Sequence, residues 1–138
     1  MKKNLAFLFI ITTLLTACAG TSSVSLSDTT WELVSYGPID TPIPALPDID
    51  AIIFFSADGE IGGNVGCNGF GGSVEISGDK IVVGPLMSTM MYCETIMEQE
   101  SAIMMLLTGT LNFEMDGDIL TIFSEDGISA IHLIQAEN

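Results

Sequence analysis

The feature that most constrains this chain is a concentration of glycine between residues 55 and 72. The glycines of this segment stand in a region otherwise rich in apolar residues: Gly59, Gly62, Gly63, Gly66, Gly69, Gly71 and Gly72. Glycine weakens a strand unless the backbone needs a positive φ or another group approaches it closely. The segment therefore predicts tight turns and close packing around Gly66-Cys67-Asn68, a packing role before a catalytic one.

Turn sequences recur about every ten residues through the folded part of the chain. They are Asp58-Gly59, Ser77–Lys80, Asp116–Asp118 and Glu125–Gly127. The β-prone runs around them are residues 29–36, 51–57, 60–65, 73–77, 81–83, 110–115, 119–123 and 128–134. Short strands at this spacing predict a closed or nearly closed antiparallel sheet. Alternation along the first strand places Trp31, Leu33 and Ser35 on one face.

A proline-rich stretch interrupts the strands between residues 37 and 50. It contains Pro38, Pro42, Pro44 and Pro47. Proline has no N–H to donate, so this stretch cannot form a central strand. We expect a rigid connector that crosses the surface; the alternative is a proline-rich ligand motif.

One segment, residues 94–107, has the pattern of a helix instead of a strand. It contains helix formers, lacks Gly and Pro, and stops just before Gly109. At 100° per residue its apolar side chains form one stripe: Ile96, Ile103 and Leu107, flanked by Met97, Met104 and Leu106. We expect an amphipathic helix that covers the sheet or closes one end of it.

Glu100 lies inside this apolar stripe, which is unusual for a carboxylate. We hypothesise that it accepts hydrogen bonds from backbone amides of the Gly66–Asn68 or Thr89 segment. Such bonding would be structural. The alternative is a catalytic carboxylate, for which the sequence offers no partner.

The amino terminus has the pattern of a lipoprotein signal. The apolar run Leu5–Leu15 reaches only about half of a ~30 Å hydrocarbon core, so it is a signal segment and not a membrane span. Leu15-Thr16-Ala17-Cys18 resembles the lipobox of bacterial lipoproteins, which implies that Cys18 becomes the first residue and carries fatty acyl chains such as palmitate. An ordinary signal peptide with a chance cysteine is the alternative.

We therefore divide the chain into a signal (residues 1–17), a lipidated flexible tether (18–27) and one folded domain (28–136). Roughly 115 residues remain beyond the tether, enough for one hydrophobic core. Ala19 is not the Asp of an inner-membrane retention signal, so we expect the periplasmic face of the outer membrane in a bacterium with two membranes.

The mature chain is strongly acidic. Loss of Lys2 and Lys3 with the signal takes the formal charge from −15 to −17 and leaves Lys80 as the remaining base. One lysine cannot neutralise a row of phosphates, so nucleic-acid binding is excluded, and an anionic membrane surface would repel the domain. Such acidity is typical of a solvated surface and favours cations or basic partners.

Cys67 and Cys93 are the thiols that remain once Cys18 is lipidated. In an oxidising compartment we expect them to form a disulfide; a redox-active or nucleophilic cysteine is the alternative. His132 alternates with Ile131 and Leu133 in an expected strand, which favours a solvated or hydrogen-bonded residue over a base or metal ligand.

The methionines and acidic turns raise the question of a metal site. Thioethers suit Cu(I), yet we expect the helical Met97, Met104 and Met105 in a core stripe or at its margins, where methionine fills irregular gaps. The methionines concerned are Met87, Met90, Met91, Met97, Met104 and Met105. The acidic turns lack a complete Ca²⁺ loop, so hairpin chemistry explains them. We expect no metal and no cofactor.

The order of several motifs resembles the META domain, the HslJ-like family of small bacterial envelope lipoproteins. The matching residues are Trp31-Glu32-Leu33, then Gly66-Cys67-Asn68, then Thr89, Met90 and Cys93, then Glu98 or Glu100 at the helix start. The resemblance implies a compact, mainly β fold: an antiparallel β-barrel-like meander of about seven or eight strands with one amphipathic helix. It implies structural roles for Trp31, Gly66, Asn68, Thr89 and Glu100, no established enzymatic activity, and an association with heat, stress and drug tolerance.

We therefore expect a monomeric, lipid-anchored envelope protein that is not an enzyme and that acts by binding an unknown envelope partner or by stress protection. One alternative is a carrier or sensor of a small apolar ligand, which requires a cavity in the barrel. That cavity would be absent if Trp31, Phe54, Phe113 and Phe123 filled the interior. A second alternative is an inhibitor of a basic envelope enzyme such as a lysozyme, suggested by the negative charge.

Overall fold

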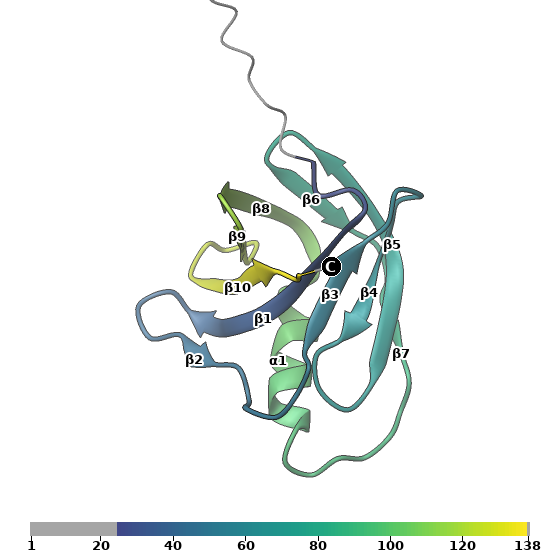
Figure 1. Ribbon diagram of the computed structural model, residues 1–138, viewed down its shortest axis with the longest axis vertical. Helices are drawn as coiled ribbons and strands as arrows, with labels where there is room; N and C mark the ends of the chain where they lie inside the picture. The colour runs from purple at the N-terminus through teal and green to yellow at the C-terminus, as the bar shows by residue number, and fades with distance from the viewer. Residues whose placement is uncertain (1–24, 138) are drawn as a thin grey trace, which may run out of the picture.

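The computed structural model describes residues 25–137, which form a β-barrel with a helix at one end (Figure 1). The signal, Cys18 and most of the tether lie outside the described residues. The elements are β1 (Thr29–Pro38), β2 (Ile43–Pro44), β3 (Ile52–Phe55), β4 (Glu60–Asn64), β5 (Gly69–Ser77), β6 (Lys80–Val83), β7 (Met87–Ser88), α1 (Met97–Leu106), β8 (Gly109–Asp116), β9 (Ile119–Phe123) and β10 (Ser129–Gln135).

The barrel is an antiparallel meander that closes on itself. Its strands follow the order β1-β3-β4-β5-β6-β8-β9-β10, and β10 pairs back with β1. The short β2 pairs with β1, and β7 pairs with β5, so neither belongs to the closed ring. The predicted mainly β barrel with one helix is confirmed for the described residues, because the turn sequences lie between the strands as expected.

A β-bulge in β1 changes which side chains reach the core. Trp31 and Leu33 are buried as alternation predicts, but the register with β10 shifts between Leu33 and Ser35. Val34 is exposed, Ser35 is half-buried and Tyr36 is buried. The prediction that Ser35 lies on the buried face is therefore wrong. The bulge adds one residue to β1, so that Tyr36, and not Ser35, is the next side chain to point into the core.

Every strand of the closed barrel contributes to one apolar core. The largest side chains that are less than 2% exposed are Trp31, Phe55, Leu26, Ile53, Ile61, Ile81, Ile103, Leu107, Leu111, Leu120, Ile122 and Ile131. They form a single cluster with their neighbours, so the interior of the barrel is packed with side chains.

Two of the four aromatic side chains expected inside the barrel lie elsewhere. Trp31 and Phe113 are buried, but Phe54 is 39% exposed and Phe123 is half-buried. Side chains alternate along a strand, so Phe55 takes the inner face of β3 and Phe54 the outer one. The Phe54 ring lies across Gly62, where its Cζ is 2.7 Å from the position of a Cβ.

The helix starts three residues later than the sequence predicts. Residues 94–96 form turns, in which the Ile96 and Met97 amides both donate to the Cys93 carbonyl at 3.1 and 3.2 Å. Ile103 and Leu107 are buried as expected, while Ile96 is half-buried. The helix packs against β1 and β10. Within residues 25–137, no helix is long and apolar enough to cross a membrane.

The proline-rich stretch is a surface connector, as predicted. Most of residues 38–50 are exposed. The two residues of β2 pair with β1, Pro44 opposite Ser35 and Ile43 opposite Tyr36. The connector is tied to the helix by the Leu46 amide, which donates to the Gln99 Oε1 atom at 2.8 Å.

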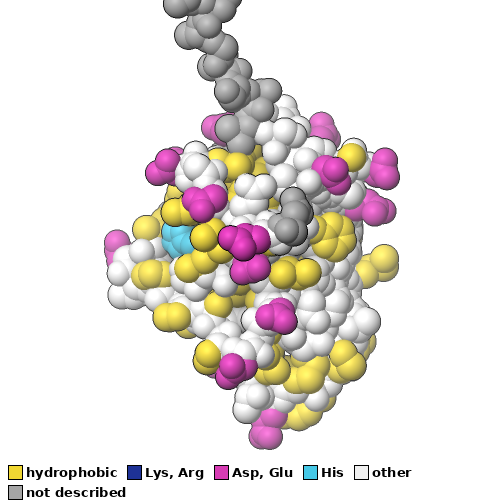
Figure 2. Space-filling view, viewed as in Figure 1, with side chains coloured by type: hydrophobic (Ala, Val, Ile, Leu, Met, Phe, Trp, Pro, Cys, Tyr) yellow, Lys and Arg dark blue, Asp and Glu magenta, His cyan; other side chains and the backbone are white. Residues whose placement is uncertain are grey.

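Acidic side chains are spread over the face of the molecule that Figure 2 shows. Lys80, the sole lysine or arginine of the described residues, donates from its Nζ to the Asn112 Oδ1 atom at 2.8 Å, between β6 and β8. The surface can therefore repel anions over much of its area.

Phe55→Ala should destabilise the domain far more than Phe54→Ala. Removing the buried Phe55 ring leaves a cavity worth about 3–5 kcal/mol, whereas the exposed Phe54 ring loses contact on one side only. Urea denaturation of the two variants measures the difference in unfolding free energy. Equal losses would contradict the assignment of Phe55 to the core.

Candidate functional site

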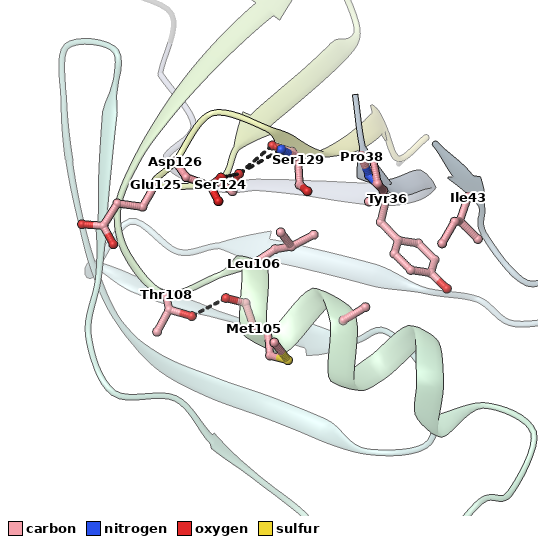
Figure 3. A pocket seen from close by; sticks show the side chains of 12 residues that line it. Tyr36, Pro38, Ile43, Met105, Leu106, Thr108, Ser124, Glu125, Asp126 and Ser129 are labelled. Atoms are coloured by element: carbon pink, nitrogen blue, oxygen red, sulfur yellow. Dashed lines mark hydrogen bonds between the residues drawn. The ribbon is translucent and has the colours of Figure 1, made fainter. Parts of the chain in front are cut away.

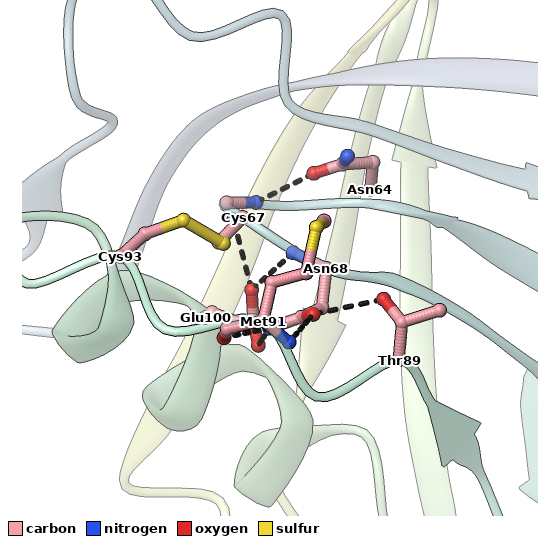
Figure 4. Close-up of a disulfide and its surroundings, with 8 residues drawn as sticks. Asn64, Cys67, Asn68, Thr89, Met91, Cys93 and Glu100 are labelled. Carbon is pink, nitrogen blue, oxygen red and sulfur yellow. Dashed lines mark hydrogen bonds between the residues drawn. A yellow bond between two sulfur atoms is a disulfide. The ribbon is translucent and has the colours of Figure 1, made fainter.

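The Glu100 carboxylate holds the glycine-rich turn against the start of the helix (Figure 4). Its Oε2 atom accepts from the backbone amides of Cys67 and Asn68 at 2.9 and 2.7 Å. Its Oε1 atom accepts from the Asn68 Nδ2 atom at 2.8 Å. The hypothesis that Glu100 binds backbone amides of the Gly66–Asn68 segment is confirmed. Three N–H donors therefore satisfy the Glu100 carboxylate in place of a cation.

Asn68 joins the turn to the segment that follows β7. Its Oδ1 atom accepts from the Thr89 hydroxyl at 2.8 Å and from the Met91 amide at 2.7 Å. Its Nδ2 atom donates to the Met91 carbonyl at 3.1 Å as well as to Glu100. Asn68 is 3% exposed, so its amide group is fully engaged in a nearly dry site.

A disulfide between Cys67 and Cys93 closes the same region, with the two Cα atoms 5.9 Å apart. It joins the glycine-rich turn to Cys93, whose carbonyl accepts from the Ile96 and Met97 amides where α1 begins. This pairing agrees with the prediction from the sequence. Glu100, Asn68 and the disulfide thus connect one turn, one loop and one helix, and we call this set the polar junction.

Gly66 is the position where the helix comes closest to the turn. A Cβ on Gly66 would lie 2.9 Å from the Ile96 Cγ2 atom and 3.0 Å from the Glu100 Cβ atom. Either distance is shorter than carbon atoms tolerate, so a side chain here would push the helix away. The glycine has the packing role that its sequence context predicts.

Gln99, next to the polar junction, is a buried polar residue whose role was not predicted from the sequence. It is 1% exposed, its Nε2 atom donates to the Val65 carbonyl at 2.7 Å, and its Oε1 atom accepts from the Leu46 amide. A signal was present: Gln99, Ile103 and Leu107 recur every four residues, which places Gln99 on the buried row of the helix.

The remaining motif residues lie apart from the polar junction. Trp31 is in the core, where its Nε1 atom donates to the Thr29 hydroxyl at 2.8 Å. His132 is half-buried, with its Nδ1 atom 3.2 Å from the Thr121 hydroxyl, which agrees with a hydrogen-bonded strand residue. Among residues 25–137, no three His, Cys, Asp or Glu side chains are placed to hold a metal ion.

The methionines divide into two groups. Met97 and Met104 are half-buried, as expected for the margins of a core stripe. Met105, which was expected in the same place, is 78% exposed, because it follows Met104 by 100° around the helix. The methionines between β6 and α1, one in β7 and two in the loop after it, are exposed: Met87, Met90 and Met91.

A groove of about 630 Å³ lies between α1 and the barrel (Figure 3). We call it the helix groove. Its lining residues come from β1 and β2, from the C-terminal half of α1 and the residues just after it, and from the turn between β9 and β10 with the first residue of β10: Tyr36, Gly37, Pro38, Ile43, Ala102, Met105, Leu106, Thr108, Ser124, Glu125, Asp126 and Ser129. Its volume is within the range of sites for small ligands.

Two ionisable groups of the helix groove have shifted pKa values. Burial raises the pKa of the Tyr36 hydroxyl, and the negative charge of Glu98 raises it further, so this phenol stays protonated. Hydrogen bonds from the Ser124 hydroxyl at 2.6 Å and the Ile128 amide at 3.1 Å lower the pKa of the Asp126 carboxyl. Asp126 is therefore ionised at neutral pH.

Comparison with known proteins places the chain among small domains of the same fold. The family described as META domain matches residues 24–137. A Burkholderia xenovorans protein solved by NMR is 22% identical, with 82% of this chain and 85% of that chain covered and a TM-score of 0.69. A DUF4847 family protein from Bacteroides vulgatus is 16% identical, with coverage of 82% and 96% and a TM-score of 0.58. The comparison with curated proteins found no match.

Glu100→Gln should destabilise the domain by about 2–4 kcal/mol. The new amide must turn its NH₂ group either toward the Cys67 and Asn68 amides or toward the Asn68 Nδ2 atom, so at least one buried donor loses its acceptor. Urea denaturation measures the loss.

Glu98→Gln is the matched control for this change. Glu98 is two residues before Glu100 on the same helix and is exposed, so its replacement should alter the unfolding free energy by less than about 0.5 kcal/mol. An unchanged Glu100→Gln stability would contradict a structural role for the carboxylate.

Proposed function

The chain belongs to the META domain family, and on that premise we propose that it is a lipid-anchored, non-catalytic binding domain of the bacterial cell envelope. The association with heat, stress and drug tolerance that the family resemblance implies favours a protective role. The helix groove carries the proposal, because it is a preformed hollow in a domain whose polar centre is otherwise used for packing.

The chemistry of the polar junction supports binding over catalysis. Each oxygen of Glu100 and each polar side-chain atom of Asn68 already has a partner within the protein. Cys67 and Cys93 are joined to each other, and a disulfide is not a nucleophile. An active site would need a general base and a reactive group that are free to meet a substrate.

The rigidity of the groove walls also supports binding. The helix is held at its start by Glu100 and by the disulfide, and Gln99 ties it to the connector that carries β2. A site with fixed walls loses little conformational entropy when a ligand enters. In this proposal the polar junction fixes the structure and the helix groove binds the ligand.

A carrier of small apolar ligands fits this proposal in a modified form. The packed core argues against a ligand inside the barrel, so the helix groove outside it is the place for such a ligand. The alternative of an inhibitor of a basic envelope enzyme is favoured by the acidic surface, which could meet a basic partner over a wide area (Figure 2).

A lipid anchor on Cys18 can be tested by fractionation. The full chain should enter the membrane fraction and be released by detergent but not by high salt, because acyl chains hold it and the domain itself is acidic. Cys18→Ser should move the chain to the soluble envelope fraction. A Cys18→Ser chain that stays in the membrane fraction would contradict the anchor.

Ligand binding in the helix groove can be tested with the uncharged fluorescent probe N-phenyl-1-naphthylamine. The mature chain with Cys18→Ser should show saturable fluorescence, and Ala102→Phe, which fills the groove, should weaken binding by about tenfold or more. Ser101→Phe is the control, since Ser101 is exposed on the same helix and does not line the groove. Equal binding by both variants would count against the groove.

A further inference from the structure

The helix groove is polar at one end and apolar at the other (Figure 3). Ser124, Glu125 and Asp126 line the end formed by the turn between β9 and β10, while Tyr36 and Ile43 line the end formed by β1 and β2. Leu106 lies on the helix between them. A ligand that follows the groove therefore passes from carboxylates to aliphatic and aromatic side chains.

Tyr36 lies at the apolar end of the helix groove. It is 5% exposed, and its hydroxyl makes no hydrogen bond with the other groove residues drawn in Figure 3. Every fully buried side-chain polar atom of the described residues does have a partner. The Tyr36 oxygen therefore keeps some access to solvent, and Tyr36 is one of the residues that line the groove.

The charged side chains that line the helix groove are both acidic. Glu125 and Asp126 line one end, and the charge of Glu98, which does not line the groove, raises the pKa of Tyr36 at the other end. No lysine or arginine lines the groove, and Lys80 donates to Asn112 between β6 and β8. An anion would be repelled, and a neutral chain would gain only from burial of apolar surface.

We propose that the helix groove binds an amphipathic organic cation, with an ammonium group near Glu125 and Asp126 and an apolar body over Leu106 and Ile43. The proposal rests on the function proposed above, because it names the class of ligand for the same groove. The polar head is attracted by two carboxylates, and the body covers side chains that water otherwise meets.

The test compares three probes with the same chain and different head groups: decylammonium, decanoate and 1-decanol. Each is titrated against the mature Cys18→Ser chain loaded with N-phenyl-1-naphthylamine, and displacement of the fluorescence gives its affinity. Decylammonium should bind about tenfold more tightly than decanoate, and 1-decanol should have an intermediate affinity. Added salt should reduce the difference in affinity between decylammonium and decanoate.

Two variants separate a local charge from the overall field of the protein. Glu125→Gln should lower the affinity for decylammonium by about two- to five-fold and leave the affinity for 1-decanol unchanged, because one carboxylate of the groove is lost. Asp118→Asn removes the same charge from the turn between β8 and β9, outside the groove, and should leave both affinities unchanged.

Failure of this inference can be told apart from failure of the proposed function. Equal affinity for all three probes, or equal effects of Glu125→Gln and Asp118→Asn, would overturn a site for cations while the fluorescent probe still reports a binding groove. If the fluorescent probe itself does not bind, both the groove function and the cation site are rejected.

Discussion

The carboxylate of Glu100 is the interaction on which the arrangement of this domain depends. It faces the backbone amides of Cys67 and Asn68 from a distance that only glycine at position 66 permits. Breaking these bonds would leave buried donors without acceptors, at a cost of about 1–3 kcal/mol each. The glycine-rich turn and the helix start are consequently bound to each other and cannot shift separately.

The position of the helix in turn creates the helix groove. The polar junction holds the start of α1, while Leu106 and Met105 near its end line the groove with Tyr36 and Ile43. Gln99 extends the connection to the proline-rich connector through Leu46. A substitution in the polar junction can therefore alter the groove without touching it, because the helix connects the two.

The barrel itself is stabilised in a more ordinary way, by alternation along each strand. Much of it could be predicted, since turn residues and β-prone runs are local signals. Phe54 and Phe55 show the limit of such prediction. Both are apolar and adjacent, and only the register of β3 against β1 and β4 decides that Phe55 enters the core and Phe54 covers Gly62.

The fold class, the turns and the unusual position of Glu100 could be read from the chain alone, because composition, spacing and periodicity are properties of the chain. The pairing of Cys67 with Cys93 was an expectation from the same source. Tertiary structure alone decided the bulge that buries Tyr36, the role of Gln99 and the existence of the helix groove. These depend on contacts between Val65, Leu46 and the helix, or between β1 and the turn after β9, which are far apart in the chain. No local pattern reports such contacts, because their energy is gained only when the barrel has closed.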